Sequence, residues 1–156
     1  MEKNKPTPTA TAATNFILAV FRLNNLLLRS GDRLVEPLGL TSARWQILGT
    51  IAYAERAQPV AWLARDLGAN RQNVQRIVND LETAGLLAFE ANPHHRRAQL
   101  VVLTDKGRRT FESAMRLQVP WVESLCEGLS LKDVEISNRV VGVLREKLGR
   151  EEESEE

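Results

Sequence analysis

The fold of this chain is decided by residues 59–87, PVAWLARDLGANRQNVQRIVNDLETAGLL, which have the pattern of two short helices joined by a tight turn. Apolar residues spaced i, i+3, i+4 and i+7 within residues 60–67 predict a first helix with one buried face. Gly68 follows where a left-handed cap needs the residue without a Cβ, and Asn70 stands where a second helix needs an N-cap acceptor. Gly85 ends that second helix, whose buried positions are Val74, Ile77, Val78 and Leu81.

The outer face of the second helix carries amides and arginines rather than the glutamates and lysines of an ordinary solvated helix. At 100° per residue, Gln72, Arg76 and Asn79 lie opposite the buried positions. Amide and guanidinium groups match base edges in the major groove, which the second helix of a helix–turn–helix enters. The competing interpretation is a helical hairpin whose outer face has no function. The candidate DNA-reading residues are Asn70, Arg71, Gln72, Asn73, Gln75, Arg76 and Asn79.

A β-hairpin is predicted directly after this helix pair. Residues 87–91 and 99–103 are strand-like, and Asn92-Pro93 marks a turn between them. The tip of the hairpin is either a solvated loop or a basic wing beside the recognition helix. We favour the wing, because the narrow minor groove concentrates negative potential and attracts arginine. The candidate wing residues are His94, His95, Arg96 and Arg97.

Short motifs along most of the chain, taken in their order and spacing, resemble those of one known family. They are Leu40-Thr41-Ser42-Ala43-Arg44-Trp45-Gln46-Ile47-Leu48, Trp62-Leu63-Ala64, Asn70-Arg71-Gln72-Asn73-Val74, Leu81-Glu82 with Gly85-Leu86, and Arg96-Arg97-Ala98 followed by Leu103-Thr104-Asp105-Lys106-Gly107. Over about residues 15–148 the chain resembles the MarR family of bacterial transcription regulators. The resemblance implies a homodimeric winged helix–turn–helix protein on a palindromic operator, usually a repressor that a small, often aromatic, effector releases.

The wing departs from the pattern of the family it resembles. That pattern is often Asp-Pro-x-Asp-Arg-Arg, whereas Asn92 and His95 replace both acidic residues here. A carboxylate at position 95 would pair with Arg97 and orient it, which His95 does not do in the same way. Both arginines remain, so we expect minor-groove contact, with Arg96 at the tip and Arg97 nearer the phosphates or the wing's own frame.

The composition is that of one soluble domain. The chain has 156 residues, 43% hydrophobic and 26% charged, enough to bury a core without disulfides or metal. Its net charge of +1 hides an uneven distribution, because residues 60–109 carry eight basic and five acidic residues while residues 151–156 hold five of the twenty acids. The single cysteine, Cys126, suits a reducing cytoplasm. We expect no signal peptide and no apolar run of the ~20 residues needed to span a bilayer.

The expected organisation is mainly α with a small β-hairpin wing, in a single domain at residues 14–148. A winged helix–turn–helix core at residues 41–103 lies between dimerisation helices at about 14–36 and 104–148. The first of these helices is apolar on more than one side and needs a partner chain to cover it. Pro120 should kink or break the helix that follows Thr104. Outside the domain we expect a disordered arm at residues 1–13 and a disordered acidic tail at residues 149–156.

The sequence lacks the motifs of the common enzyme classes. It has no Gly-x-Ser-x-Gly, no phosphate loop and no His–Glu helix pair, and its two histidines are adjacent on a loop, so we expect neither catalysis nor a metal or other cofactor. One alternative to an effector-responsive repressor is a redox sensor using Cys126, whose neighbours Glu123 and Glu127 disfavour a reactive thiolate. We interpret Cys126 as a small core residue. The other alternative is a winged-helix module that binds protein.

The large aromatics near the junction of the dimerisation helices and the winged core are candidates for an effector pocket. A helical aromatic at core spacing is more often plain packing than part of a binding site. The partners expected are therefore double-stranded DNA, a second copy of the chain and a small aromatic effector, with no membrane. The candidate pocket residues are Phe21, Trp45, Tyr53, Trp62, Phe111 and Trp121.

Overall fold

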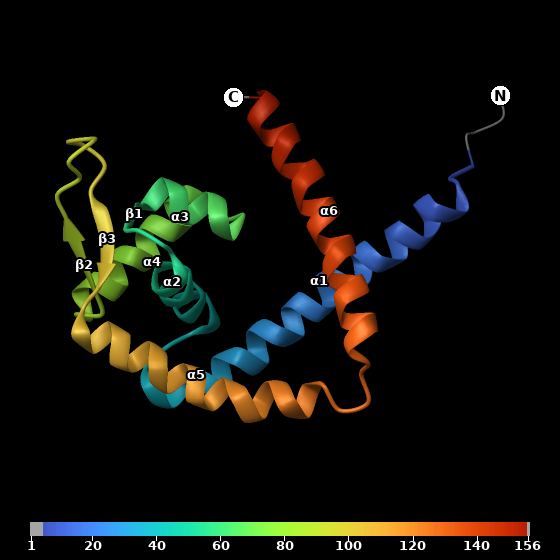
Figure 1. Ribbon diagram of the computed structural model, residues 1–156, viewed down its shortest axis with the longest axis horizontal. Coiled ribbons are helices and arrows are strands. Elements are labelled where there is room, and N and C mark those ends of the chain that lie inside the picture. The colour runs from blue at the N-terminus through green and yellow to red at the C-terminus, as the bar shows by residue number, and fades with distance from the viewer. Residues whose placement is uncertain (1–4, 156) are drawn as a thin grey trace.

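The computed structural model describes residues 5–155 of the chain, and the surroundings of side chains as far as residue 150. The elements are α1 (Pro8–Val35), the short 3-10 helix η1 (Glu36–Leu38), α2 (Ser42–Tyr53), β1 (Gln58–Pro59), α3 (Val60–Leu67), α4 (Arg71–Thr83), β2 (Leu87–Glu90), β3 (Leu100–Leu103), α5 (Asp105–Leu125) and α6 (Leu131–Glu155). Figure 1 shows a lobe built from α2, α3, α4 and the three strands, from which α1, α5 and α6 extend. The predicted class, mainly helical with a small winged sheet, is confirmed.

The helix–turn–helix forms as its local sequence predicts. Gly68 adopts the left-handed conformation, φ 60°, and its N–H donates to the carbonyl oxygens of the last turn of α3. The Asn70 side chain accepts bonds from the backbone N–H groups of Gln72 and Asn73, at 2.9 and 3.3 Å, and so caps α4. Gly85 ends the pair with φ 74°. The buried contacts that hold α4 in the lobe come from Leu63, Val74, Val78 and Leu81, each at most 2% exposed.

The wing belongs to a three-stranded antiparallel sheet in the order β1-β3-β2. Leu87 pairs with Leu103 and Glu90 with Leu100, so β2 and β3 form the expected hairpin. Strand β1 could not be predicted, because its two residues, Gln58 and Pro59, are too few to show a periodic pattern. This strand ties the start of α3 to β3 and so fixes the wing relative to the helix–turn–helix.

The beginning of α5 is fastened to the turn that ends α4. Thr104 caps α5 by accepting a bond from the N–H of Gly107 at 3.0 Å, and its hydroxyl donates to the carbonyl oxygen of Gly85 at 2.7 Å. Lys106 donates through Nζ to the carbonyl oxygen of Ala84 at 2.8 Å. This bond satisfies a carbonyl that the end of α4 leaves free. Residues 104–107 therefore fasten the start of α5 to the end of α4.

Three expectations about helix boundaries were wrong. Residues 8–13 form the first turns of α1 rather than part of a disordered arm, because Thr7 caps the helix and Pro8 occupies its first position; residues 1–4 of that arm lie outside the described part. Pro120 does not break α5, since it is exposed and water can satisfy the carbonyl that its missing N–H leaves free. Finally, α6 continues past Gly149, where we expected it to end in a disordered tail.

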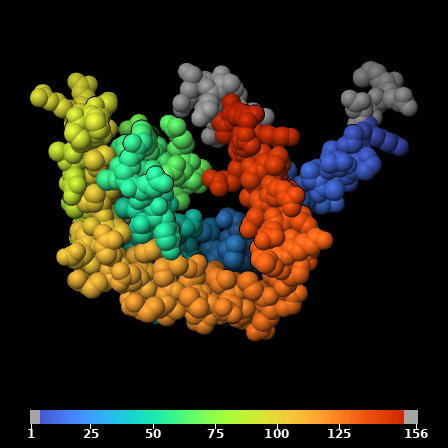
Figure 2. All heavy atoms as spheres, in the orientation of Figure 1, coloured from blue at the N-terminus to red at the C-terminus, as the bar shows by residue number. Residues whose placement is uncertain are grey.

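The helices outside the lobe leave much apolar surface uncovered. Only Gly31 and Val35 are buried among the 28 residues of α1, which joins the lobe at its C-terminal end through hydrogen bonds from Ser42 to Asp32 and Leu28. Figure 2 shows the outer part of α1 standing clear of the lobe, whereas α6 meets the lobe at Arg145, which donates a hydrogen bond to the carbonyl oxygen of Asp66 at 3.4 Å. By length and composition, residues 8–38 are apolar enough to cross a membrane, contrary to our expectation. The large exposed apolar residues are Ile17, Leu18, Val20, Phe21, Leu23, Leu26 and Leu27 on α1, with Leu131, Val134, Ile136, Val140, Val141, Val143 and Leu148 on α6.

Candidate nucleic-acid interface

The outer face of α4 presents nearly the predicted set of side chains. Arg71, Gln72, Arg76 and Asn79 are exposed, and Gln75 is half-buried. The amide of Gln75 donates to the side-chain oxygen of Asn79 one turn later, at 2.9 Å, so these two groups are already aligned along the helix. Asn73 is also exposed, whereas Asn70 uses its side-chain oxygen as the helix cap and keeps only its amide N–H donors for a base edge.

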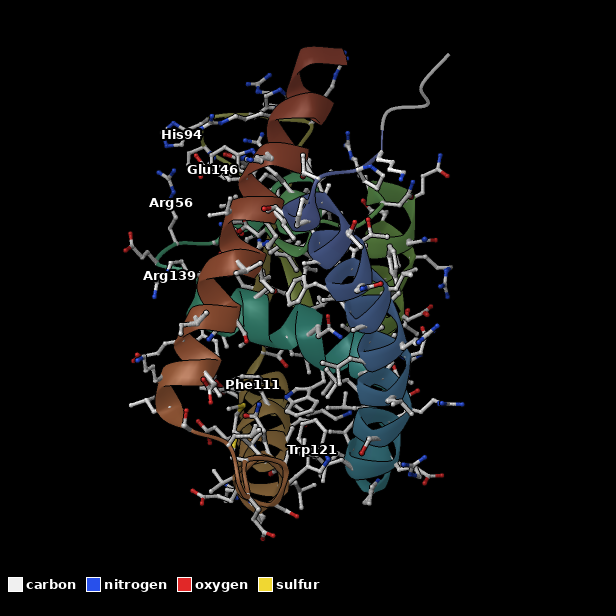
Figure 3. The ribbon with its side chains drawn as sticks, turned by 90° about the vertical axis from the view of Figure 1, so that its right-hand side faces the viewer. Arg56, His94, Phe111, Trp121, Arg139 and Glu146 are labelled. Carbon is white, nitrogen blue, oxygen red and sulfur yellow. The ribbon has the colours of Figure 1, made fainter. Side chains whose placement is uncertain are left out.

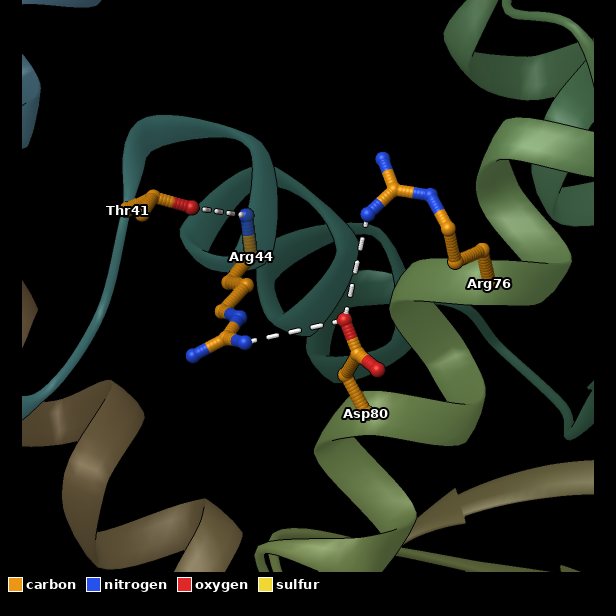
Figure 4. A network of polar contacts seen from close by, with 4 residues as sticks. All are labelled: Thr41, Arg44, Arg76 and Asp80. Atoms are coloured by element: carbon orange, nitrogen blue, oxygen red, sulfur yellow. Dashed lines mark hydrogen bonds and ion pairs between the residues drawn. The ribbon is translucent and has the colours of Figure 1, made fainter.

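An ion-pair network that the sequence did not reveal lies on the same face (Figure 4). The Asp80 carboxylate oxygen Oδ2 lies 3.6 Å from Arg44 Nη2 and 4.0 Å from Arg76 Nη1. Arg44 comes from the first turn of α2, where its backbone N–H donates to the Thr41 side chain at 3.3 Å. The spacing of Arg76 and Asp80 at i, i+4 is a signal that could have been read. Arg44 could not have been found, because only the tertiary fold brings α2 beside α4.

A groove of about 530 Å³ separates α4 from the wing. The residues of α4 that face it are Arg71, Gln75 and Asn79, which form a single stripe at i, i+4 and i+8. His95 and Arg97 face it from the wing, so two of the four predicted wing residues meet three of the predicted helix residues across one concavity. The lining is Pro59, Val60, Ala61, Trp62, Arg71, Gln75, Asn79, Phe89, His95, Arg97, Ala98 and Gln99.

The wing loop is held in shape by Asn92. Its Nδ2 donates to the carbonyl oxygen of Ala98 at 2.9 Å, and its Oδ1 accepts from the backbone N–H of His94 at 3.0 Å. An aspartate in this position could accept the second bond but could not donate the first. The departure from the resembled family's pattern at position 92 therefore supplies a bond across the loop. Arg96 and Arg97 are exposed, and no ion pair occupies either of them within the described part of the chain.

Four of the six candidate pocket aromatics form two pairs where helices meet. Trp45 and Trp121 lie with ring centroids 6.5 Å apart, and Trp121 Nε1 donates to the Ser30 hydroxyl at 3.1 Å. Tyr53 and Phe111 make an edge-to-face contact at 5.7 Å. Figure 3 shows Phe111 and Trp121 between α5 and α1. The first pair thus links α1, α2 and α5, at the junction where an effector site was expected.

The other two aromatics lie elsewhere. Phe21 is 64% exposed on the outer part of α1. Trp62 is 43% exposed and lines the groove beside α4, with the guanidinium carbon of Arg56 5.4 Å from its ring centroid. Cys126, interpreted above as a core residue, is exposed at the end of α5 because the apolar pattern there faces away from the lobe. Among the described residues, no three potential ligands gather into a metal site.

A recognition helix with an amide-and-arginine face, a basic wing beside it and a fixed groove between them define a winged helix–turn–helix protein. The family model described as "MarR family" matches residues 38–98, which contain α2, the helix–turn–helix and most of the wing. The match falls on the same part of the chain whose motifs resemble this family. MarR-family proteins are transcription regulators rather than enzymes.

Relatives in sequence match a little more of the chain. An uncharacterized protein of Mycobacterium tuberculosis is 46% identical over 94 residues, covering 60% of this chain and 64% of the relative. The transcriptional activatory protein BadR of Rhodopseudomonas palustris is 32% identical over 102 residues, covering 64% of this chain and 58% of BadR. The matched segment thus spans less than two thirds of the length of either relative.

Solved structures match nearly the whole chain. The transcriptional repressor CouR bound to a 23-mer DNA duplex has a TM-score of 0.74 at 23% identity, covering 90% of this chain and 99% of CouR. CouR from Rhodococcus jostii RHA1 bound to p-coumaroyl-CoA also has a TM-score of 0.74, at 20% identity, covering 85% of this chain and 91% of that one. At these identities the likeness shows a shared fold, including the long helices outside the lobe.

Proposed function

We propose that this protein is a sequence-specific DNA-binding regulator of transcription that acts as a homodimer on a palindromic operator. The observation that carries the proposal is the continuous surface formed by α4 and the wing. Arg71, Gln75 and Asn79 face His95 and Arg97 across one groove, so a helix for the major groove and a wing for the minor groove stand side by side. A two-fold pair would present this surface twice, about one helical turn of DNA apart, ~10 bp.

The uncovered helices support the dimer. Exposed apolar side chains run along α1 and α6, and none of the described residues of α6 is buried. Removing such surface from water stabilises an assembly by roughly 25 cal/mol per Å². A second copy would cover α1 and α6 together, whereas insertion of α1 alone into a membrane would leave α6 exposed. We therefore place the protein in the cytoplasm as a pair joined through α1 and α6.

The junction of α1, α2 and α5 is the proposed effector site. Trp45 and Trp121 offer flat apolar faces there. A polar group of an aromatic effector could take the place of the Ser30 hydroxyl as the acceptor for Trp121 Nε1–H. The binding of p-coumaroyl-CoA by CouR supports an aromatic class of effector. An effector that favours the wrong separation of the two recognition helices by ~2–3 kcal/mol would weaken operator binding about 30- to 150-fold. We propose that the protein represses transcription, as the repressor CouR does. A reporter assay distinguishes repression from activation, the role in the name of BadR.

Sedimentation of the protein with and without a labelled duplex tests this proposal. We expect a dimer alone and two chains per bound duplex. Phe21→Asp, which places a charge on the exposed face of α1, should yield monomers that keep their helical circular dichroism and bind duplex weakly. A wild-type protein that stays monomeric at micromolar concentration, or that binds no duplex at low salt, would overturn the proposal.

A further inference from the structure

The groove between α4 and the wing has a consequence if the proposed function holds. When a helix lies in the major groove and a wing in the adjacent minor groove, the sugar–phosphate strand that divides the two grooves must pass between them. We propose that the groove beside Trp62 carries this strand, and that Arg56, held over the Trp62 ring, is an anchor for one of its phosphates. The inference rests on the proposed function and adds two residues to it that base reading does not require.

The chemistry of the groove fits a nucleic-acid backbone. Arg71 enters it from α4 and Arg97 from the wing, and no acidic residue is among its described lining residues. Trp62 provides an apolar ring on the third side and remains 43% exposed. A strand of DNA alternates anionic phosphates with the apolar faces of deoxyribose, so it needs cations and a flat apolar surface in turn. A compact effector would need a more enclosed and more apolar site than this one.

Arg56 is oriented without being neutralised. It lies in the segment between α2 and β1, with its guanidinium carbon 5.4 Å from the centroid of Trp62. An acidic partner would hold an arginine equally well but would cancel its charge, and no such ion pair is found for Arg56 within the described residues. Stacking on a ring leaves the N–H edges of a guanidinium free to bond a phosphate. Figure 3 shows Arg56 and His94 of the wing projecting to the same side of the molecule.

The inference separates Trp62 from the other aromatics grouped with it by sequence. If Trp62 supports Arg56, its loss should affect DNA binding differently from the loss of a tryptophan that binds an effector. Loss of the ring should weaken binding of every duplex, with or without effector, because the contact it supports is to the backbone.

Fluorescence anisotropy with an operator duplex and a scrambled duplex tests the anchor. Arg56→Gln should weaken binding of both by about ten-fold and, because the dimer loses two phosphate contacts, lower the slope of log affinity against log salt by about 1.8. Trp62→Leu should weaken both as well, and the part of that loss that acts through Arg56 should disappear when Arg56 is already replaced. Arg33→Gln, an exposed arginine in the last turn of α1, is the matched control and should leave affinity unchanged.

A duplex with single neutral methylphosphonates locates the contact. One position in the strand between the two grooves should weaken the wild type and have no effect on Arg56→Gln. If the wild type binds duplex but Arg56→Gln matches it in affinity and salt slope, the anchor is refuted and the proposed function stands. If the wild type binds no duplex, the proposed function itself fails.

Discussion

Replacing Asp80 by asparagine separates how tightly this surface binds DNA from how well it selects a sequence. Asp80 is the single acid among the residues that line the hollow between Arg71 and Asp80 on α4, and it holds Arg44 and Arg76 at 3.6 and 4.0 Å. Asparagine keeps the size of the side chain and removes its charge. We expect Asp80→Asn to bind all duplexes somewhat more tightly and to distinguish between them less well.

The structure sets the size of each effect. The paired side chains are between 35% and 69% exposed, so each pair contributes about 0.2–1 kcal/mol, and unfolding free energy should fall by no more than ~1–2 kcal/mol. If each carboxylate lies about 8 Å from a phosphate in water, the repulsion is about 0.5 kcal/mol per subunit, so its loss from both subunits should raise affinity for a scrambled duplex roughly five-fold. Arg76, freed from Asp80, should lose about 1 kcal/mol or more of its discrimination between bases, a roughly five-fold drop in selectivity.

The assay is anisotropy with operator and scrambled duplexes, compared at two salt concentrations. Glu82→Gln is the matched control, since it removes an exposed acid from the same helix that makes no ion pair within the described residues. It should leave the ratio of the two affinities unchanged. The reasoning is refuted if Asp80→Asn keeps the wild-type ratio, or if it weakens binding of the scrambled duplex.

Three further predictions concern the frame and the wing. Gly107→Ala should lower the free energy of unfolding by ~3 kcal/mol or more in urea titration, since an added Cβ would lie 1.9 Å from the backbone oxygen of Leu86; wild-type stability would contradict this close approach. Asn92→Asp should speed amide exchange in the wing loop and cost ~1 kcal/mol, because the donor to the opposite carbonyl is lost; unchanged exchange would remove Asn92 from the frame. Replacing both Arg96 and Arg97 with Ala should reduce the salt slope of DNA binding by about two to four, since the dimer loses one or two contacts from each wing, and a wild-type slope would show that the wing does not touch DNA.

Local patterns in the sequence were enough for the helix–turn–helix. Gly68 and Asn70 mark the turn by backbone chemistry that depends on neighbouring residues alone, and both behave as predicted. The wing hairpin follows from strand pattern and a turn in the same way. Contacts between distant segments could not be predicted from the sequence. The ion-pair network at Asp80 is the main example, because Arg44 approaches Asp80 from a separate helix.

Other failures have physical causes of the same kind. Trp62 and Trp45 both lie near the start of a helix, yet one lines the groove beside the wing and the other packs on Trp121, since the faces of their helices point to different neighbours. The start of α1 was missed because Thr7 and Pro8 were interpreted as features of a flexible arm rather than as a cap and a first turn. Proline and threonine are common both in flexible arms and at the start of helices, so only the residues that follow distinguish the two.

The central claim is that two copies of the α4 surface read DNA together, and selection of duplexes from a random pool by the purified protein tests it most directly. The account predicts enrichment of a two-fold symmetric sequence with half-sites about 10 bp apart, centre to centre. In the same selection, Arg76→Ala should lose preference at matching positions in both half-sites. A pool that shows no enrichment, or a preferred sequence without symmetry, would contradict the account.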